Sequence, residues 1–477
     1  MIIHYSRGFV NIFLVFLRIL PVFTPFLTVW KSAAEDGILF MLANTAGSAV
    51  KSPERSAKMV VAVVSELNPF HNGHAAIFEY AKNLAFSADG LPIASPDSRN
   101  TVFAVMSGNY CQRGEPALLD KWTRARVAIN CGADAVAEIP SVYAQQSAQF
   151  FADSAIDIIC KSEIVDAVVF GSETGDLSLL KGIASKKTAA FRGENFRLSQ
   201  KGSPSYPKAV ETSLGTALSP NDILAVEYLC SLERHNSPIR AVAFKRLGST
   251  DHNSLAAPEG PFASAAYIRN TVSRCPSTAC DDFISLRNYM PGIAYETLKE
   301  CCESGKTVNS LSAYSSLIIG KIRELGEAGV ASLPFAGGGL ATKIYDECCN
   351  TSDLSTVVRN CTCKAFTSGR IRRILLSVLT SSEASVFTKN SYLADVPYIR
   401  LLAVRGGDKS FLAGLTRSAP VPVIVGNIPK NYETTFPHEC AALLKKEILA
   451  SDLYPLGYRD PSAAVAHKEF TTPLIKE

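Results

Sequence analysis

Short apolar runs alternate with amphipathic stretches along most of the chain. The runs span residues 59–64, 101–106, 134–139, 166–170 and 239–244. The stretches that follow them have the apolar spacing and polar first residues of helices, over 74–86, 120–131 and 145–160 and from 219 onward. Asp120 is placed to cap one of these helices. The alternation predicts an α/β fold with a Rossmann-like, doubly wound parallel sheet.

Polar or glycine residues follow four of the five predicted strands. Such sheets bind their ligands at the carboxyl ends of the strands, so these residues are expected to meet at one edge. Each group by itself also fits an ordinary turn, a helix cap or a solvated strand end. The groups are 71–74, 107–109, 171–173 and 245–246.

The motif His71-Asn72-Gly73-His74 has the most specific chemistry. A helix start offers free N–H groups and a partial positive charge, and Gly73 allows the backbone to approach phosphates closely. Two imidazoles one turn apart can stabilise the charge that develops on an α-phosphate during adenylyl transfer. A turn with two ordinary histidines is the alternative. The strand–turn–helix context favours catalysis, as does the rarity of histidine, with 7 in 477 residues.

The part of the chain from about residue 281 to the C-terminus has Leu and Ile at helical spacing. We therefore expect a catalytic domain over 59–275 and a mainly helical domain over 281–477. Basic residues outnumber acidic residues between 364 and 417, and residues 368–376 resemble an amphipathic helix with a basic face. Such a face is commonly just solvated, but it also suits binding to a phosphate backbone.

Composition sets only broad limits on function. The chain is 47% hydrophobic and 19% charged, as in globular proteins, and its net charge of +4 neither requires nor excludes a nucleic-acid partner. Its 13 cysteines show no paired C-x-x-C spacing, which argues against a zinc site and for free, reduced thiols.

The N-terminal residues 1–58 are set apart as an extension. Residues 9–30 are strongly apolar, which would suit a signal anchor or a membrane span, but Arg18, Pro21 and Pro25 interrupt them. The interpretation that we favour is that translation begins at Met59, immediately before the first strand.

Several sequence blocks occur beyond Met59, at 66–74, 105–110 with 112–117, 120–125, 170–173, 219–224, 263–265 with 268–269, and 397–402. Together these blocks resemble the tRNA(Met) cytidine acetate ligase family, a branch of the HxGH nucleotidyltransferases. They occur in family order over nearly all of residues 59–410. Leu67 is a departure, because an aromatic residue is expected there, and residues 1–58 have no counterpart.

The resemblance implies a cytoplasmic enzyme without a stable membrane partner. ATP would activate acetate as acetyl-adenylate with release of pyrophosphate, and Mg²⁺ is expected to accompany ATP. The acetyl group would then pass to N4 of the wobble cytidine of elongator tRNA(Met). The alternative is an adenylyltransferase, or a carboxylate–amine ligase similar to pantothenate synthetase, acting on a small molecule. A non-catalytic RNA-binding protein is a further alternative.

The same resemblance assigns catalytic and ATP-binding roles to individual residues. We expect no metal ligands among the protein side chains. His71 and His74 are the expected catalytic residues. The expected ATP-binding residues include these two and are Val64, Glu66, Asn68, Pro69, Phe70, His71, Asn72, Gly73, His74, Gly171, Asn221, Arg246, Ser264 and Arg269. The local excess of basic residues, together with the implied tRNA substrate, gives the expected tRNA-binding residues, which are Arg370, Arg372, Arg373 and Arg400.

Overall fold

The computed structural model describes residues 58–191, 218–247, 258, 260–382 and 394–477. The alternatives for the N-terminal extension therefore concern a segment, 1–57, that lies outside the described residues. Residues 58–477 form one compact unit, so the expected boundary near residue 280 does not separate two units. Among the described residues, no helix combines the length and the apolar character needed to cross a membrane.

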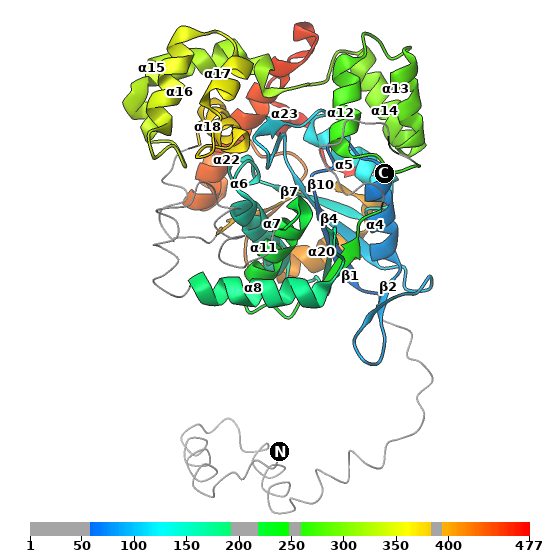
Figure 1. The fold of residues 1–477 in the computed structure, drawn as a ribbon. Helices are drawn as coiled ribbons and strands as arrows, with labels where there is room; N and C mark the ends of the chain where they lie inside the picture. The colour runs from blue at the N-terminus through cyan, green and yellow to red at the C-terminus, as the bar shows by residue number, and fades with distance from the viewer. Residues whose placement is uncertain (1–57, 192–217, 248–257, 259, 383–393) are drawn as a thin grey trace, which may run out of the picture. The chain divides into compact units, whose positions relative to one another are not determined.

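One mixed, eight-stranded sheet forms the centre of this unit (Figure 1). Its strands run in the order β11-β10-β7-β4-β1-β8-β9, and β12 pairs with β10. The five predicted strands are confirmed as β1, β4, β7, β8 and β9, and they are mutually parallel. The strands are β1 (Val60–Ser65), β4 (Thr101–Ser107), β7 (Ala135–Ile139), β8 (Ala167–Ser172), β9 (Arg240–Lys245), β10 (Ile399–Val404), β11 (Val423–Val425) and β12 (Ile475–Lys476).

Helices cover both faces of the sheet, which confirms the doubly wound arrangement. One apolar core lies between the sheet and α7 (Ala148–Ser162), α8 (Leu177–Phe191), α11 (Pro220–Arg234), α20 (Lys409–Ser418) and α22 (His438–Leu453). The core on the other face includes α4 (Asn72–Lys82), α5 (Lys121–Asn130), α12 (Ala265–Arg274), α13 (Asp281–Ser285) and α14 (Gly292–Glu303).

Four further helices form a layer with its own core, which we call the helical layer (Figure 1). They are α15 (Ser315–Ala331), α16 (Leu340–Asn350), α17 (Leu354–Cys361) and α18 (Ser368–Thr380).

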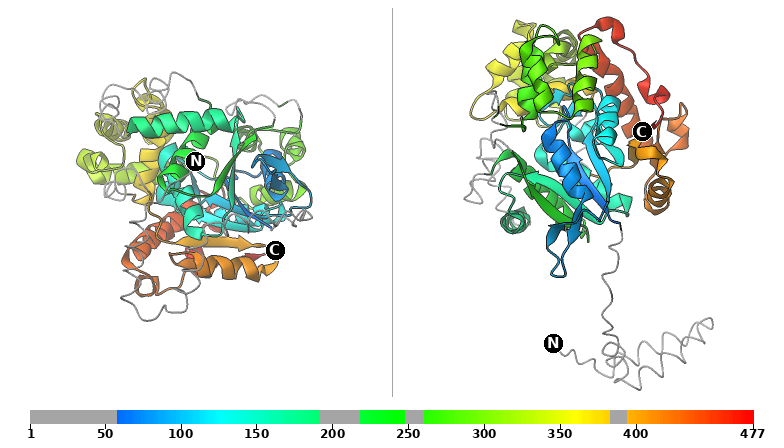
Figure 2. Two further views of the ribbon diagram at one scale, coloured as in Figure 1. Left: turned by 90° about the horizontal axis from the view of Figure 1, so that it is seen from below. Right: turned by 90° about the vertical axis from the view of Figure 1, so that its right-hand side faces the viewer.

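The region beyond residue 281 is not helical throughout, because β10, β11 and β12 return to the sheet. Strand β10 is buried along its whole length and pairs antiparallel with β7, covering an edge that would otherwise leave backbone groups unpaired. Figure 2 shows β10 and β11, in orange, along one side of the sheet.

The remaining elements are short. The helix expected over 74–86 ends at Lys82, because residues 84–86 form a strand that pairs with 92–94. The short elements are β2 (Leu84–Phe86), β3 (Pro92–Ala94), β5 (Tyr110–Cys111), β6 (Glu115–Pro116), α6 (Ser141–Ala144), α21 (Tyr432–Thr435), α23 (Lys468–Thr471), η2 (Leu286–Asn288), η3 (Leu311–Tyr314), η4 (Arg405–Gly407), η5 (Tyr454–Gly457) and η6 (Pro461–Ala463).

Candidate active site

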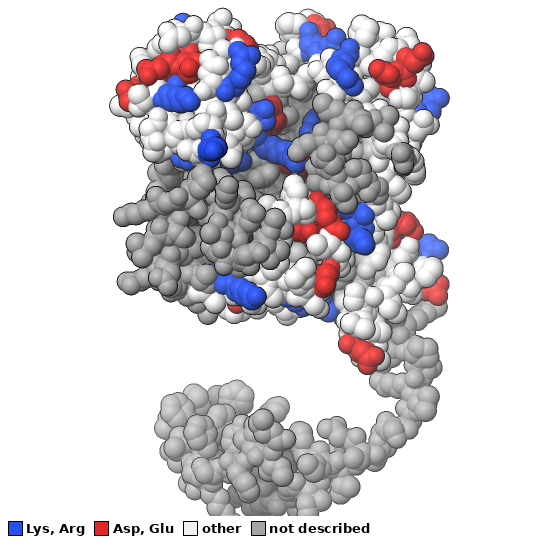
Figure 3. All heavy atoms as spheres, in the orientation of Figure 1, with Lys and Arg blue, Asp and Glu red and all other residues white. Residues whose placement is uncertain are grey.

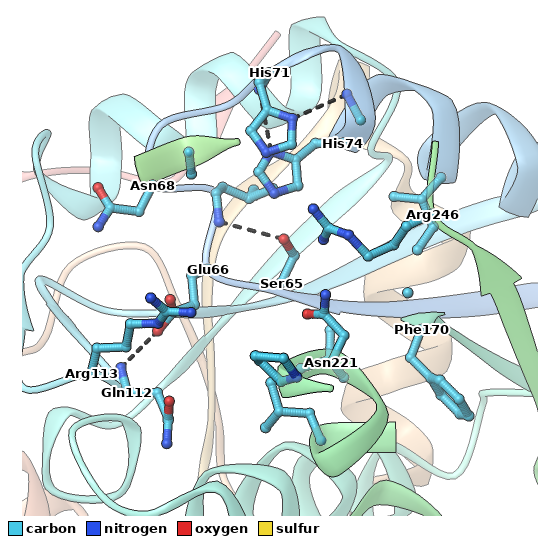
Figure 4. A pocket seen from close by; sticks show the side chains of 18 of the residues that line it. Ser65, Glu66, Asn68, His71, His74, Gln112, Arg113, Phe170, Asn221 and Arg246 are labelled. Atoms are coloured by element: carbon cyan, nitrogen blue, oxygen red, sulfur yellow. Dashed lines mark hydrogen bonds between the residues drawn. The ribbon is translucent and has the colours of Figure 1, made fainter. Parts of the chain in front are cut away.

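A cavity of about 380 Å³ opens at the carboxyl ends of β1 and β8 (Figure 4). From β1 the chain continues to β4 and β7 on one side of the sheet and later to β8 and β9 on the other. The cavity therefore lies where the strand order reverses, the usual ligand position in open α/β sheets. We refer to it as the nucleotide cavity.

Four helices begin at the nucleotide cavity. Its lining includes His71 at the start of α4, Ala148 at the start of α7, Asn221 at the start of α11 and Ala265 at the start of α12. Helix N-termini carry unpaired N–H groups and a partial positive charge, so their convergence favours an anionic ligand.

The two histidines cap α4 reciprocally. His71 Nδ1 accepts a hydrogen bond from the Gly73 N–H at 3.0 Å, and His74 Nδ1 accepts one from the His71 N–H at 3.2 Å. This is the pattern of a capping box, with imidazoles in the places of Ser and Glu. The rings stack with their centroids 3.8 Å apart. Because each Nδ1 is an acceptor, the proton of each neutral ring is on Nε2.

His74 is kept neutral by its surroundings. Desolvation by burial and the nearby charge of Arg246 lower the pKa of His74 to about 3. The part of its surface that remains accessible faces the nucleotide cavity. At neutral pH, His74 is therefore an uncharged hydrogen-bond donor through Nε2.

Gly73 is required by the histidine pair itself. A Cβ atom at this position would come within 2.9 Å of His71 Cε1 and 3.0 Å of His71 Nδ1. Any larger residue would displace the His71 ring from its capping position. The backbone at Gly73 thus makes room for the ring, in addition to the access to phosphates that the sequence suggested.

Among the described residues, four arginines line the nucleotide cavity, against one carboxylate, that of Glu66. Burial lowers the pKa of Arg246 and Arg269, and burial with the nearby Arg370 lowers that of Arg373 to about 10. Arg246 Nε is buried without a hydrogen-bond partner among the described residues. Desolvated guanidiniums in a concave site suit a polyphosphate, which can accept two hydrogen bonds from each.

The loop after β1 is held by two arginines from other segments. Arg269 donates to the Asn68 carbonyl at 2.6 Å, and Arg124 donates to the Glu66 carbonyl at 2.7 Å. The Glu66 carboxylate accepts the Gln112 N–H at 2.6 Å (Figure 4). Leu67 has a φ of 48° and is fully buried, so the loop holds a conformation that non-glycine residues rarely adopt.

Most of the expected ATP-binding residues line the nucleotide cavity. They are Val64, Glu66, Asn68, His71, Gly73, His74, Gly171, Asn221, Arg246 and Arg269. Asn221 Nδ2 donates to the Glu173 carboxylate at 2.7 Å. The Asn68 amide bonds to Leu118 N–H and to Cys111 Sγ, so it also fixes the loop.

Four of the expected residues lie outside the lining. Pro69 and Phe70 are buried beneath the loop, and Phe70 belongs to the core around α4. The Asn72 side chain donates to the carbonyls of residues 261 and 288, and Ser264 Oγ caps α12 by accepting the Tyr267 N–H. These side chains do not face the cavity; their packing and hydrogen bonds fix the backbone around it.

Several lining residues were not predicted from the sequence. Arg113 and Gln112 lie in the family-like block 112–117, and membership of that block could have identified them as site residues. The aromatic residues Phe170, Tyr228 and Phe244 follow a pattern that is equally typical of a core. Arg373 comes from α18 in the helical layer, a contribution that no local pattern could reveal.

The expected tRNA-binding arginines occupy different environments. Arg370 donates to the Phe335 carbonyl, Arg372 Nε lies 3.0 Å from Glu115 Oε1, and Arg373 lines the nucleotide cavity. Arg400 is 2% exposed in β10 and pairs with Glu469 at 3.0 Å. This burial corrects the expectation that Arg400 contacts tRNA. Figure 3 shows basic and acidic side chains interspersed over the helices at the top of the view.

A buried charge network joins α5, β7 and the C-terminal segment. Lys121 Nζ lies 2.7 Å from Glu138 Oε1 and 3.3 Å from Glu447 Oε1, and it also pairs with Glu469. These three carboxylates are close enough together to hold a metal ion, but the Lys121 ammonium already forms an ion pair with each of them. Burial and the Glu447 carboxylate raise the pKa of Glu138 well above its usual value. The Lys121 ammonium, together with the Arg400 guanidinium that pairs with Glu469, offsets the negative charge of this cluster.

The fold and the histidine-bearing helix start define the class to which the chain belongs. The profile of the HIGH nucleotidyl transferase family matches residues 58–469. The chain is 31% identical over 432 residues to a protein of Thermoanaerobacter sp. (strain X514), covering 87% of this chain and 99% of that protein. It is 33% identical over 410 residues to a protein of Caldicellulosiruptor saccharolyticus, with coverages of 83% and 94%. Both are named tRNA(Met) cytidine acetate ligase.

Solved structures agree with this result. The apo crystal structure of Thermotoga maritima TmcAL matches with a TM-score of 0.76 at 25% identity, over 88% of this chain and all of that one. A second structure of the same protein, bound with alpha-thio ATP, matches with a TM-score of 0.73 at 24% identity, over 88% and 99%. The chain therefore belongs to the tRNA(Met) cytidine acetate ligase family of HIGH nucleotidyl transferases.

Proposed function

We propose that the chain is an ATP-dependent acetate ligase that modifies tRNA. It forms acetyl-adenylate from acetate and ATP, and then transfers the acetyl group to N4 of the wobble cytidine of elongator tRNA(Met). The family relatives' names support the substrate, and the alpha-thio ATP bound to a structural neighbour supports the nucleotide. The observation that carries the proposal is the pair of Nε2–H donors at a helix start in an arginine-lined cavity.

In the first step, the acetate carboxylate attacks the α-phosphorus of ATP and pyrophosphate leaves. The nucleotide cavity holds the phosphates by backbone N–H groups and by guanidiniums from Arg246 and Arg269. His71 and His74 donate through Nε2 to the α-phosphate oxygens as negative charge builds up there. Donors that are fixed before the reaction stabilise the transition state without a reorganisation cost.

In the part of the chain that the structure describes, the residues lining the cavity do not form a dedicated Mg²⁺ site. The single carboxylate among them, that of Glu66, already accepts the Gln112 N–H. Mg²⁺ prefers several oxygen ligands and often binds through substrate phosphates, so it would arrive with ATP. The steps assigned to the protein side chains do not depend on it.

In the second step, the cytidine amine attacks the acyl carbon and AMP leaves. The reactive mixed anhydride requires positioning more than a strong base. Arg373 brings the helical layer to the rim of the nucleotide cavity, and Arg372 is partly exposed beside it. Phosphates of a tRNA bound over α18 would therefore place a base near the adenylate.

Acetate-dependent exchange of labelled pyrophosphate into ATP tests the first step in the full-length chain. We expect exchange with acetate alone and acetyl transfer only after addition of methionine tRNA. His74→Ala should reduce exchange by about 10²–10³-fold, as for the loss of one charge-stabilising donor. His438→Ala, at an exposed position, is the control and should leave exchange unchanged.

Other outcomes would redirect the proposal. Exchange that ignores acetate but responds to another small phosphate or carboxylate would favour the small-molecule alternative. Retained tRNA binding without any ATP turnover in the wild-type chain would leave only a binding protein.

A further inference from the structure

Two cysteine thiols meet at the junction of α12 and α13. Cys275 Sγ and Cys280 Sγ lie 2.7 Å apart, and both residues are free thiols. The separation exceeds the roughly 2.05 Å of a disulfide bond, so the two thiols are adjacent but not bonded to each other. Neither residue belongs to the nucleotide cavity or to the steps proposed above.

The local backbone holds the two thiols in place. Cys275 ends α12, with its N–H bonded to the Thr271 carbonyl, and Pro276 prevents the helix from continuing. A turn then returns the chain, because the Cys280 N–H bonds to the Ser277 carbonyl at 3.4 Å. Cys280 Sγ caps α13 by accepting the Phe283 N–H. Since the loop is already closed, joining its ends costs little further chain entropy.

A small reagent can reach this pair. Cys275 lines a second cavity, of about 430 Å³, together with Cys302 from α14. Cys280 is partly exposed, whereas Cys275 is 8% exposed. Because Cys280 is the more accessible of the two thiols, we expect the first attack to come from Cys280. Burial and the adjacent Cys280 also raise the pKa of Cys275 to about 12, which makes Cys275 a poor first nucleophile.

We propose that Cys275 and Cys280 form a site of reversible thiol–disulfide exchange whose oxidants are low-molecular-weight disulfides. The Cys280 thiolate attacks one sulfur of the oxidant and expels the other half as a thiolate. Cys275 Sγ then attacks Cys280 Sγ, releases its proton to solvent and expels the second half. Two protein thiols become one disulfide, and the oxidant becomes two thiols.

The site lies on a helix that also serves the nucleotide cavity. Helix α12 carries Arg269, which lines the cavity and donates to the Asn68 carbonyl, and Cys275 closes the other end of the helix. A bond between Cys275 and Cys280 would fix that end. The chemistry of the thiols is independent of the proposed acetate ligase activity.

Peptide mapping of the full-length chain tests the proposal. The protein is incubated with oxidised glutathione, acid-quenched, alkylated and digested with trypsin, which leaves both thiols in one peptide, Cys275–Arg287. We expect that peptide to become lighter by two hydrogen atoms, to escape alkylation, and to regain both thiols with dithiothreitol. Alkylation of both cysteines after oxidation would overturn the proposal, as would a bond from Cys275 to Cys302.

Variants test the order of attack. Cys275→Ser should trap glutathione on Cys280 as a stable mixed disulfide, because the resolving thiol is absent. Cys302→Ser is the matched control and should still form the internal disulfide. If a serine variant does not fold, the mass change of the wild-type peptide still decides the matter.

Discussion

The nucleotide cavity and the network around Lys121 both contain buried positive charge, but they differ in whether carboxylates neutralise it. Lys121 and Arg400 are surrounded by three carboxylates, so their charges are balanced within the protein. Among the described residues, Arg246, Arg269 and Arg373 form no salt bridge, although burial lowers their pKa values. The comparison indicates that the paired cations, Lys121 and Arg400, contribute to the stability of the fold. The arginines that form no salt bridge are instead available to bind an anionic ligand.

Replacing Lys121 should have the largest effect on stability. Lys121→Met would leave Glu138, Glu447 and Glu469 buried without their shared cation, and breaking a buried ion pair typically costs about 3–5 kcal/mol. Urea denaturation at pH 7 measures this, with the exposed Lys445→Met as control. The loss should shrink at lower pH, because protonation removes the stranded charges. An unchanged denaturation midpoint would show that the network is not structural.

Replacing Arg246 should affect ligand binding and leave stability intact, the reverse of what we expect for Lys121. Arg246→Gln should weaken ATP binding by about ten- to a hundredfold, the usual value of a charge-assisted hydrogen bond of about 1.5–3 kcal/mol. Stability should stay the same or rise, since no carboxylate loses its partner. Calorimetric titration with a non-hydrolysable ATP analogue and urea denaturation give both numbers. Destabilisation with unchanged affinity would contradict the comparison.

The lowered pKa of His74 should appear as pH-dependent stability. The unfolded chain protonates this histidine below about pH 6.5, whereas the folded chain keeps it neutral down to about 3. The unfolded state therefore binds more protons, so stability falls as the pH falls from 6.5 towards 3. Between pH 7 and 5.5 the contribution is about 1 kcal/mol. His74→Gln should lose this share of the slope, and the exposed His438→Gln should retain it.

The smallest effect is expected for replacement of Arg372, which has a carboxylate partner but is partly exposed. Its pair with Glu115 is about one-third exposed on both sides, so Arg372→Ala should change stability by less than about 1 kcal/mol. If tRNA phosphates contact α18, the dependence of log K on log salt should become shallower by about one unit. Filter binding at several salt concentrations measures this. Arg373 is not a suitable substitute, because it also lines the nucleotide cavity.

Local patterns predicted the elements that position the site. The apolar runs identified all five parallel strands, and polar residues at the helix starts located the beginnings of α5 and α11. The site residues that follow these elements directly, such as His74, Gly171 and Arg246, line one cavity for that reason.

Long-range pairing explains what the sequence did not reveal. Arg400 was counted with a basic surface because its partner, Glu469, lies 69 positions away in the chain. Arg373 was assigned to the same surface, but it lines the nucleotide cavity. The close packing of Gly114 on α18 brings this helix to the catalytic part of the chain, because a Cβ at Gly114 would lie only 2.6 Å from the Arg373 backbone nitrogen. Charge patterns along a helix cannot show which carboxylate or cavity each side chain meets.

The four helix starts at the nucleotide cavity have a consequence for mutagenesis and for evolution. Their share of the attraction for phosphate comes from peptide groups, which do not titrate and which side-chain replacement leaves in place. A chain that lost any single arginine would keep a residual affinity for nucleotides at every pH at which it folds. Side chains at this site are therefore free to change chemistry and selectivity while the backbone continues to capture the phosphate.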